Sequence, residues 1–447
     1  MKRIMIAAMH SGSGKTVVTC GLLRAFQRRG LTVESFKCGP DYIDPMFHRR
    51  VLGLPARNLD LFLQGAEGVK RTLSRQTAGL ALLEGAMGYY DGVNGTHEAS
   101  AWETAAAAEV PALLVLRPKG ISLTLAAQVA GMHAFRAPSR LAGAILTDCS
   151  PMLFSHLKPV VEEARLPVLG YLPPMEEAVF SSRHLGLVTP DEVEDLQTRF
   201  DRIAARMEET VDLDGILALA AEAGPAEGAS RGRPAARCTV AVARDEAFCF
   251  YYQDSLEARE AAGATLRFFS PMKYPPPRGV DGLYLGGGYP ELYARRLSEN
   301  TAMTAWIRRA VAAGLPTAAE CGGFLYLLES LEDRDGGRWP MCAALPGGSR
   351  PTDRLRRFGY LRLRAEEDSL LFRAGETVPA HEFHYWEADR CGGDLEAEKP
   401  SGRRWRCAFT GPGLYAGFPH LHFGGELPLA ARFADAAARF RKEGPWI

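Results

Sequence analysis

Short apolar runs alternate with amphipathic stretches through the first half of the chain. Apolar runs that predict strands cover residues 4–8, 33–37, 80–84, 112–116, 143–147 and 168–172. Helical patterns cover residues 15–29, 102–108, 123–135 and 151–163. Apolar runs separated by helices are typical of strands buried on both faces of a parallel sheet. The pattern therefore predicts an α/β domain with a doubly wound, mostly parallel sheet.

The alternation stops near residue 230 and then begins again. Residues 221–234 are small or charged or are Gly and Pro, without a large hydrophobe, which is typical of a linker. After the linker, strand patterns cover residues 239–242, 266–269, 282–285 and 315–319, and helical patterns cover residues 255–262 and 304–313. Strand-like and loop sequence dominates from residue 359 onward. We expect two α/β domains, residues 1–225 and 238–447, joined by a linker at 226–237.

Composition and charge narrow the class of protein. Among the 447 residues, 53 Lys and Arg balance 53 Asp and Glu, so the formal net charge is zero. This balance argues against a dedicated binder of nucleic acid or of anionic membranes. No apolar run reaches the roughly 18–20 residues of a membrane helix. The nine cysteines are dispersed and contain no Cys-x-x-Cys pair, so we expect reduced thiols in a cytoplasmic enzyme.

A glycine-rich segment, Ser-Gly-Ser-Gly-Lys-Thr, lies between the first predicted strand and the first predicted helix. Backbone N–H groups of such a turn, together with the helix N-terminus, bind phosphate. The predicted ATP-binding residues are Gly12, Ser13, Gly14, Lys15 and Thr16. Lys15 would bridge the β- and γ-phosphates, and the Thr16 hydroxyl would hold Mg²⁺. Met9 replaces the first glycine of G-x-x-x-x-G-K-[ST], which leaves a glycine-rich helix cap as the alternative.

Acidic loops follow the second and third predicted strands. The carboxyl ends of parallel strands meet at one edge of a sheet, so these loops should converge on the phosphate-binding segment. Mg²⁺ prefers one or two carboxylates with phosphate oxygens and water. Glu84, at a strand end, is the first choice of metal ligand, followed by Asp41 or Asp44. We expect Asp41, Asp44 and Asp91 to lie in the substrate site beside the bound phosphates; a turn-capping carboxylate is the alternative for each, and for Asp91 both interpretations stay open.

A second chemical motif lies at residues 316–327, which combine a short strand, a cysteine, two glycines and an amphipathic helix. This pattern is typical of a nucleophile elbow, a sharp turn that exposes the reactive atom. Cys321 is the predicted nucleophile, and the N–H of Gly322 is a predicted oxyanion donor. Gly287 and Gly288, in a loop after another strand, are predicted to complete the pocket. The alternative, a buried structural cysteine, is disfavoured by the flanking glycines.

A thiol nucleophile needs a base, and the informative histidines lie in the last quarter of the chain. His420 follows an apolar run, in a position from which it can return to the elbow. His381 and His384 are three residues apart, whereas H-E-x-x-H places its histidines four apart, so a zinc site is not expected. We expect His381 and His384 to pack beside the thiol site.

Together these motifs resemble the cobyrinate a,c-diamide synthase family over nearly the full length. The matching segments are 11–16, 39–45, 57–60, 84–92, 241–248, 286–291, 320–323, 381–385 and 420–423. The resemblance implies a dethiobiotin-synthetase-like P-loop domain followed by a class I glutamine amidotransferase domain. It implies that the a- and c-acetates of cobyrinate, a corrinoid, are amidated, c before a, with ATP, Mg²⁺ and L-glutamine, in cobalamin biosynthesis. A homodimer is a further family expectation.

The resemblance also assigns roles and shows where this sequence departs from the pattern. It implies that Cys321 is the nucleophile and that His420, leading the His-x-His-Phe element, is its base. His422 stands where other class I amidotransferases carry a glutamate, so a Cys–His dyad describes the site better than a triad. The sequence departs from the family pattern at Pro379 and Ala380, at residues 417–419, and at Arg117 and Pro118.

Three alternatives remain. A partition-type ATPase switch shares the loop topology, but it has a lysine where His10 stands and lacks a glutaminase domain. The second alternative is a related synthase that acts on hydrogenobyrinate or nickel-sirohydrochlorin, and sequence separates it poorly from one that acts on cobyrinate. A binding protein with an inactive glutaminase is disfavoured because Cys321 and His420 are both present. The chemistry of the main interpretation is activation of a carboxylate as an acyl phosphate, followed by attack of ammonia.

Overall fold

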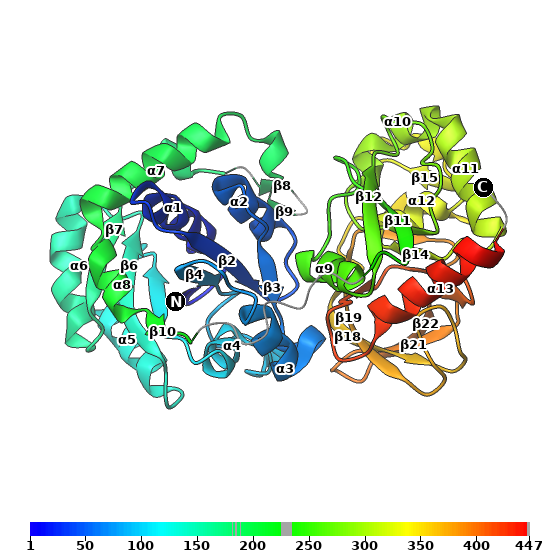
Figure 1. Cartoon of the computed structure of the whole chain (residues 1–447). Coiled ribbons are helices and arrows are strands. Elements are labelled where there is room, and N and C mark those ends of the chain that lie inside the picture. Colours follow the sequence, from blue (N-terminus) through cyan, green and yellow to red (C-terminus); the bar gives the residue numbers. More distant parts are fainter. Residues whose placement is uncertain (181, 184–185, 188, 225–234, 445–447) are drawn as a thin grey trace. The chain divides into compact units, whose positions relative to one another are not determined.

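The computed structural model describes residues 1–180, 182–183, 186–187, 189–224 and 235–444. Its internal contacts divide the chain into two compact units, Met1–Ser230 and Arg231–Ile447 (Figure 1). Residues 226–234 of the expected linker lie outside the described residues. Each unit is an α/β structure, as the alternation of strand and helix patterns predicted.

Unit 1 is built on a sheet with the strand order β3-β2-β4-β1-β5-β6-β7, and β10 pairs with β1. Its strands are β1 (Lys2–Ala8), β2 (Val33–Cys38), β3 (Arg57–Leu59), β4 (Leu80–Glu84), β5 (Ala112–Leu116), β6 (Leu141–Thr147), β7 (Val168–Leu172) and β10 (Ala221–Glu222). All pairs along this path are parallel, and β10 alone in this sheet runs antiparallel. A small hairpin of β8 (Ser182–Arg183) and β9 (Gly186–Leu187) lies outside the sheet. The predicted doubly wound parallel sheet is confirmed.

Helices cover both faces of this sheet. They are α1 (Lys15–Arg28), α2 (Ile43–Leu52), α3 (Leu61–Leu73), α4 (Ala101–Ala107), α5 (Thr124–Ala134), α6 (Pro151–Glu163), α7 (Leu196–Thr210) and α8 (Leu213–Leu219). Alternate β1 residues point to opposite faces: Ile4 and Ile6 join one apolar core, whereas Met5 and Ala7 join another. The first core contains residues of α1, α2, α7 and α8, and the second contains residues of α3 to α6. Figure 1 shows α1 and α7 side by side on their face.

Unit 2 contains a six-stranded sheet with the order β12-β11-β13-β14-β24-β23. Its strands are β11 (Cys238–Ala243), β12 (Ala264–Phe269), β13 (Gly282–Leu285), β14 (Thr317–Glu320), β23 (Phe409–Gly411) and β24 (Leu414–Gly417). The pairs from β12 to β24 are parallel, and β23 runs antiparallel at the edge. The helices of this unit are α9 (Gln253–Ala261), α10 (Ala294–Glu299), α11 (Thr301–Ala312), α12 (Gly322–Leu327) and α13 (Leu429–Glu443).

Two further sheets complete unit 2, one mixed and one antiparallel. The mixed sheet pairs β16 (Arg338–Pro340), β15 (Ser330–Glu332), β17 (Gly348–Pro351) and β20 (Trp386–Ala388), and its β15 and β17 pair in parallel. The other pairs β22 (Arg404–Cys407), β21 (Leu395–Glu398), β18 (Arg357–Ala365), β19 (Thr377–His384) and β25 (His420–Leu421). One apolar core joins residues of β11, α9 and α13 to the inner face of β18 and β19, so the second sheet packs against the parallel one. The strand-rich sequence from residue 359 onward forms most of these strands.

Candidate functional site

The phosphate-loop prediction falls at the carboxyl end of β1, directly before α1. Gly12 and Gly14 have positive φ angles of 77° and 88°, a conformation that glycine adopts without steric cost. Ser13 is buried, and its hydroxyl donates to the carbonyl oxygen of His10 at 2.9 Å. The segment therefore has the compact glycine turn and the following helix N-terminus that phosphate binding requires.

The Lys15 ammonium group lies over this turn. Nζ of Lys15 donates to the carbonyl oxygens of Met87, at 2.6 Å, and His10, at 3.3 Å. Burial lowers the pKa of Lys15 to about 8; the charge of Lys37 adds to the effect, and Glu84 opposes it. A buried lysine held by carbonyl oxygens gains a strong electrostatic partner when an anion binds beside it.

Behind the loop lies a buried charged cluster of Lys37, Asp44, His48 and Glu84. Lys37 Nζ is 2.6 Å from Asp44 Oδ2 and 3.0 Å from Glu84 Oε1. His48 Nε2 is 2.6 Å from Glu84 Oε2, and the Thr16 hydroxyl donates to Glu84 Oε1 at 2.8 Å. Glu84 has no exposed surface. The cluster therefore ties the first residues of α1 to the ends of β2 and β4.

The charges in this cluster stabilise one another. Burial alone raises the pKa of Glu84, but the charge of Lys37 and the hydrogen bonds from His48 and Thr16 outweigh it, so this pKa lies well below its ordinary value. Burial alone lowers the pKa of Lys37, but Asp44 and Glu84 reverse the effect and hold it well above its ordinary value. Glu84 is accordingly a carboxylate and Lys37 an ammonium group. Neither Lys37 nor His48 was predicted from the sequence as a site residue. The available signal for Lys37 was a lysine near the end of a strand that is buried along its whole length.

The remaining carboxylates of the prediction lie near the loop but differ in exposure. Asp44 is buried in the cluster, whereas Asp41 is partly exposed and Asp91 is exposed. Oδ1 of Asp41 accepts from the backbone N–H groups of Ile43 and Asp44 at 2.8 and 3.0 Å, and so caps α2. Oδ2 of Asp91 accepts from the N–H of Gly88 at 2.9 Å, and its charge acts on Lys15. Both carboxylates therefore make the turn-capping contacts of the alternative interpretation. They make these contacts in loops that lie near the phosphate loop.

Arg117, one of the departures from the family pattern, also reaches the phosphate loop. It follows β5, donates from Nη1 to the carbonyl oxygen of Gly12 at 3.1 Å, and forms an ion pair with Asp148. Asp148 follows β6 directly. Arg117 therefore braces the outer side of the loop, a contact that the sequence alone did not reveal.

The donor set at the loop is compatible with Mg²⁺. Oε1 of Glu84 already accepts from Thr16 and Lys37, and Oε2 lies against His48, so this carboxylate orients the Thr16 hydroxyl from behind. Thr16 and Asp41 then offer a hydroxyl and a carboxylate oxygen, to which phosphate oxygens and water add. Among the described residues no group of three or more His, Cys, Asp or Glu is placed to hold a metal by itself. The arrangement suits a cation that shares its ligands with a bound phosphate.

The thiol prediction falls in unit 2, where Cys321 connects β14 directly to α12. Its φ and ψ angles are 48° and −104°, an unusual conformation for a residue with a side chain. The backbone N–H of Cys321 donates to the carbonyl oxygen of Gly417 at 2.8 Å, and Sγ is 3.9 Å from the carbonyl oxygen of Phe383. Strained backbone at a strand–helix junction is the geometry of a nucleophile elbow. The structure therefore has the local shape that the sequence predicted.

His420 lies against this cysteine although ninety-nine positions separate them. It begins β25, where it pairs with His381 of β19, and it is only 2% exposed. Burial alone lowers the pKa of His420, but hydrogen bonds to Cys321 and Glu320 and the charges of both reverse this and raise it to about 10. An imidazole with this pKa carries a proton at neutral pH, so it is placed to act as a general acid.

The predicted glycines border the same site. A Cβ atom on Gly287 would lie 2.6 Å from Cε1 of His420, so only glycine fits there. A Cβ atom on Gly322 would lie 2.9 Å from Pro290 and 3.1 Å from the backbone nitrogen of Gly288. The structure thus brings Gly287, Gly288 and Gly322 together with Cys321 and His420.

The other histidines of the prediction have packing contacts. The ring of His384 stacks on Phe418 with centroids 3.8 Å apart, and its Nδ1 lies 2.6 Å from the carbonyl oxygen of Trp386. Burial lowers the pKa of His381 to about 3, and the charge of His420 adds to this effect. The ring of His422 lies 5.1 Å from that of Tyr252. Phe418 is one of the residues at 417–419 that depart from the family pattern, and its ring packs against that of His384.

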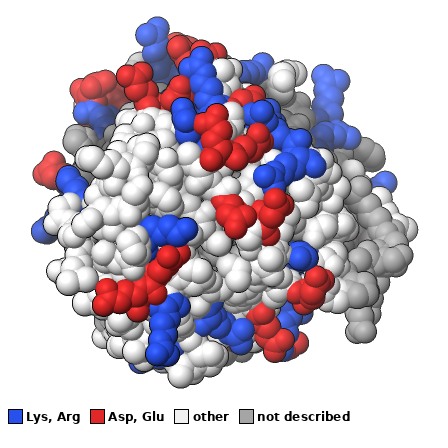
Figure 2. Space-filling view, turned by 90° about the vertical axis from the view of Figure 1, so that its left-hand side faces the viewer, with Lys and Arg blue, Asp and Glu red and all other residues white. Residues whose placement is uncertain are grey.

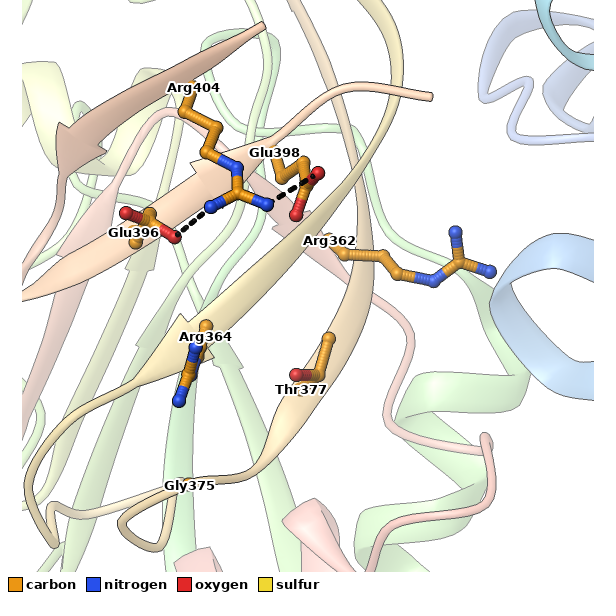
Figure 3. Close-up of a pocket in the computed structure, with 7 residues that line it drawn as sticks. All are labelled: Arg362, Arg364, Gly375, Thr377, Glu396, Glu398 and Arg404. Atoms are coloured by element: carbon orange, nitrogen blue, oxygen red, sulfur yellow. Dashed lines mark hydrogen bonds and ion pairs between the residues drawn. The ribbon is translucent and has the colours of Figure 1, made fainter. Parts of the chain in front are cut away.

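A separate cavity of about 260 Å³ lies on the five-stranded antiparallel sheet of unit 2 (Figure 3). Its lining residues are Arg362, Arg364, Gly375, Thr377, Glu396, Glu398 and Arg404. Arg404 pairs with Glu396 at 3.7 Å and with Glu398 at 3.0 Å, and Figure 3 shows Arg362 extending away from these side chains. None of the lining residues belongs to the thiol site.

Charge is mixed on the molecular surface. Figure 2 shows one face, on which Lys and Arg side chains lie beside Asp and Glu side chains with uncharged areas between them. This agrees with the formal net charge of zero. Within the described parts of the chain, every helix is too short or too polar to cross a bilayer.

Family models match both units. Residues 4–186 match a CobQ/CobB/MinD/ParA nucleotide binding domain, and residues 239–418 match a CobB/CobQ-like glutamine amidotransferase domain. The first match spans the phosphate loop and the charged cluster behind it. The second spans Cys321 and ends two residues before His420.

Curated relatives match along nearly the whole chain. A protein of Clostridium acetobutylicum is 36% identical over 96% of this chain and 98% of its own length. One of Salmonella typhimurium is 37% identical over 97% and 98%, and one of Caldanaerobacter subterraneus is 34% identical over 98% and 99%. Each of the three is named cobyrinate a,c-diamide synthase. With both units matched in order and relatives that cover 96–98% of its length, this chain belongs to the cobyrinate a,c-diamide synthase family.

Proposed function

We propose that the protein amidates the a- and c-acetate carboxylates of cobyrinate, using ATP and glutamine, in cobalamin biosynthesis. The observation that carries this proposal is the full-length relation to proteins named for that reaction, in a chain that keeps both sites. Unit 1 has a buried lysine over a glycine turn, and unit 2 has a cysteine in a strained elbow against a histidine.

The first half of the reaction takes place at the phosphate loop. Amidation needs a better leaving group than hydroxide, so a substrate carboxylate attacks the γ-phosphorus of ATP and becomes an acyl phosphate. Lys15 neutralises charge on the transferring phosphoryl group, while the N–H groups of residues 12–16 hold the phosphates. Mg²⁺, held by Thr16 and Asp41, would supply further positive charge there. Glu84 orients the Thr16 hydroxyl, and Asp44 and Asp91 complete the acidic edge of the site.

The second half takes place at the elbow. The Cys321 thiolate attacks the side-chain amide of glutamine, and the oxyanion is stabilised by the backbone N–H groups of Gly322 and of the loop at Gly287 and Gly288. His420 gives its proton to the leaving ammonia, and water then releases glutamate from the thioester. Ammonia attacks the acyl phosphate, and the products are an amide and inorganic phosphate.

The family assignment disfavours a partition-type ATPase switch, because residues 239–418 match an amidotransferase. A cytoplasmic location also belongs to the proposal, and it is supported by nine cysteines that are all free thiols. A homodimer is proposed on the family resemblance alone, and the absence of a nucleic-acid partner is proposed on the balanced charge.

The substrate is tested by mass spectrometry of products. Cobyrinate, hydrogenobyrinate and nickel-sirohydrochlorin are each incubated with the protein, ATP, Mg²⁺ and glutamine. We expect cobyrinate to gain two amides, with a monoamide as the intermediate, because both acetates need the same activation. Conversion of either other tetrapyrrole at a higher kcat/KM than cobyrinate would contradict the proposed substrate, while leaving the two-site chemistry in place.

A further inference from the structure

The carboxylate of Glu320 lies directly behind the proposed catalytic histidine. Glu320 ends β14, immediately before Cys321, and is 1% exposed. Its Oε2 is 3.5 Å from Nδ1 of His420 and 3.3 Å from the hydroxyl oxygen of Tyr284, and its Oε1 is 3.4 Å from the backbone nitrogen of Leu421. Contacts to His420 and to the next residue of the same strand hold the carboxylate in register with β25.

We propose that Glu320 is the positioning residue of the glutaminase, which orients His420 and stabilises its protonated form. The inference rests on the proposed function, because it assumes that Cys321 and His420 hydrolyse glutamine. It changes the dyad expected from the sequence into a Cys–His–Glu arrangement. The glutamate comes from the strand beneath the nucleophile instead of from the segment after the histidine.

A carboxylate beside His420 fits what a pair of nucleophile and base requires of a third group. An imidazole that shuttles protons needs a partner that holds its ring and favours its charged form. Because Nδ1 of His420 faces Glu320, Nε2 is the nitrogen left for the thiol. The position two residues beyond His420, which supplies a glutamate in other class I enzymes, is His422 here, and its ring lies against Tyr252. Contacts between a catalytic histidine and its partner commonly tighten when substrate binds.

A buried cation, Arg259, lies one side chain away from Glu320. A buried carboxylate is costly unless a cation or hydrogen-bond donors accompany it. Arg259 is fully buried; its guanidinium lies 3.7 Å from the centre of the Tyr284 ring and 3.4 Å from that of Phe423, and it donates to the carbonyl oxygen of Ser255 at 3.0 Å. The charge of Glu320 acts on Arg259. Tyr284 therefore lies between Arg259 and Glu320 and contacts both.

The groups that face His420 predict a specific pH dependence. They are Cys321 and Glu320 from β14 and its elbow, and His381 from β19; Gly287, which also faces the ring, carries no charge. His381 is neutral above its pKa of about 3, so Glu320 and the thiolate supply the negative charge. Both raise the pKa of His420, which therefore stays protonated to about pH 10 and loses its proton above it. Removing the Glu320 charge lowers the pKa of His420. The pH above which glutaminase activity falls, here called the alkaline limit, therefore moves to a lower value.

The test compares E320Q, E320D and the control E376Q in glutaminase assays across pH. Glu376 forms a bidentate ion pair with Arg432 in the same unit, and its replacement should leave the profile unchanged. We expect E320Q to lose about 10²–10⁴-fold in kcat with little change in KM. The alkaline limit of E320Q should fall by about 1–3 pH units. The pH dependence of Cys321 alkylation by iodoacetamide should shift by the same amount. We expect E320D to keep the charge, to retain an alkaline limit near that of wild type, and to lose about tenfold in kcat because its carboxylate withdraws from His420.

Circular dichroism and thermal unfolding of each variant report whether unit 2 is folded, and ammonia-dependent amidation reports whether unit 1 is intact. A folded E320Q with kcat within about twofold of wild type and an unchanged alkaline limit would overturn the role of Glu320. If E320Q does not fold, the test rests on E320D. A wild-type kcat for E320D would then also overturn the role of Glu320. Retained glutaminase in C321A would instead refute the proposed function on which the inference rests.

Discussion

Replacing Cys321 with alanine will abolish glutamine-dependent amidation and leave ammonia-dependent amidation intact. Alanine has no nucleophile to form the thioester, so glutamine hydrolysis should fall by about 10³-fold or more. The phosphate loop lies in the other unit, and with ammonium chloride as the nitrogen source it should still produce amide. The measurement is amide product and released glutamate, each with glutamine or ammonium chloride as donor.

Cys238→Ala is the matched control. Cys238 is a buried cysteine of the same unit, but it begins β11, whereas the site lies at the carboxyl ends of these parallel strands. This variant should keep both activities. Loss of ammonia-dependent amidation in a folded C321A protein would contradict the separation into two sites.

Replacing Lys15 with alanine will remove ATP-dependent synthesis with either nitrogen donor. The ammonium group lies over the glycine turn, where the γ-phosphate would bind, and no other side chain of the loop is positively charged. Loss of a positive charge on a transferring phosphoryl group costs about 10³-fold or more in rate. Basal glutaminase should remain measurable, because Cys321 and His420 are unchanged.

ADP release and amide formation are measured together for this variant. Lys158→Ala serves as the control, since Lys158 lies on α6, with nearly half of its side chain exposed, and makes only a 3.9 Å ion pair with Glu162. The control should retain wild-type synthesis. Synthesis by K15A within about tenfold of wild type would show that ATP is activated elsewhere.

Much of the fold follows from the sequence because strands buried on both faces leave a strong signal. The runs at 80–84 and 112–116 coincide with β4 and β5. The helix α7 was not singled out, although Leu196, Phe200 and Ile203 bury one of its faces at helical spacing. The register of the antiparallel sheets was beyond reach, because the pairing of His420 with His381 depends on strands far apart in the sequence.

The candidate sites show the same contrast between local motifs, which the sequence predicts, and contacts between distant segments, which it does not. Local motifs predicted the glycine turn and the elbow, because a few consecutive residues determine each. The partners that adjust these groups come from distant segments: Lys37 and His48 reach Glu84 from another strand and helix, and Arg117 reaches Gly12. Glu320 was visible as the residue before the nucleophile, but only the return of β25 shows what its carboxylate faces. Sequence reasoning thus predicted the local shape around the candidate reactive groups better than the long-range contacts that surround them.

The coupling of the two sites is tested most directly by tracing nitrogen. Cobyrinate is incubated with the wild-type protein, ATP, Mg²⁺ and glutamine labelled with ¹⁵N at the side-chain amide, and the product is analysed by mass spectrometry with and without ATP. We predict a diamide that carries ¹⁵N at both new amides and forms only when ATP is present. Glutamine hydrolysis without transfer of ¹⁵N to cobyrinate, or an equally labelled product without ATP, would contradict the account.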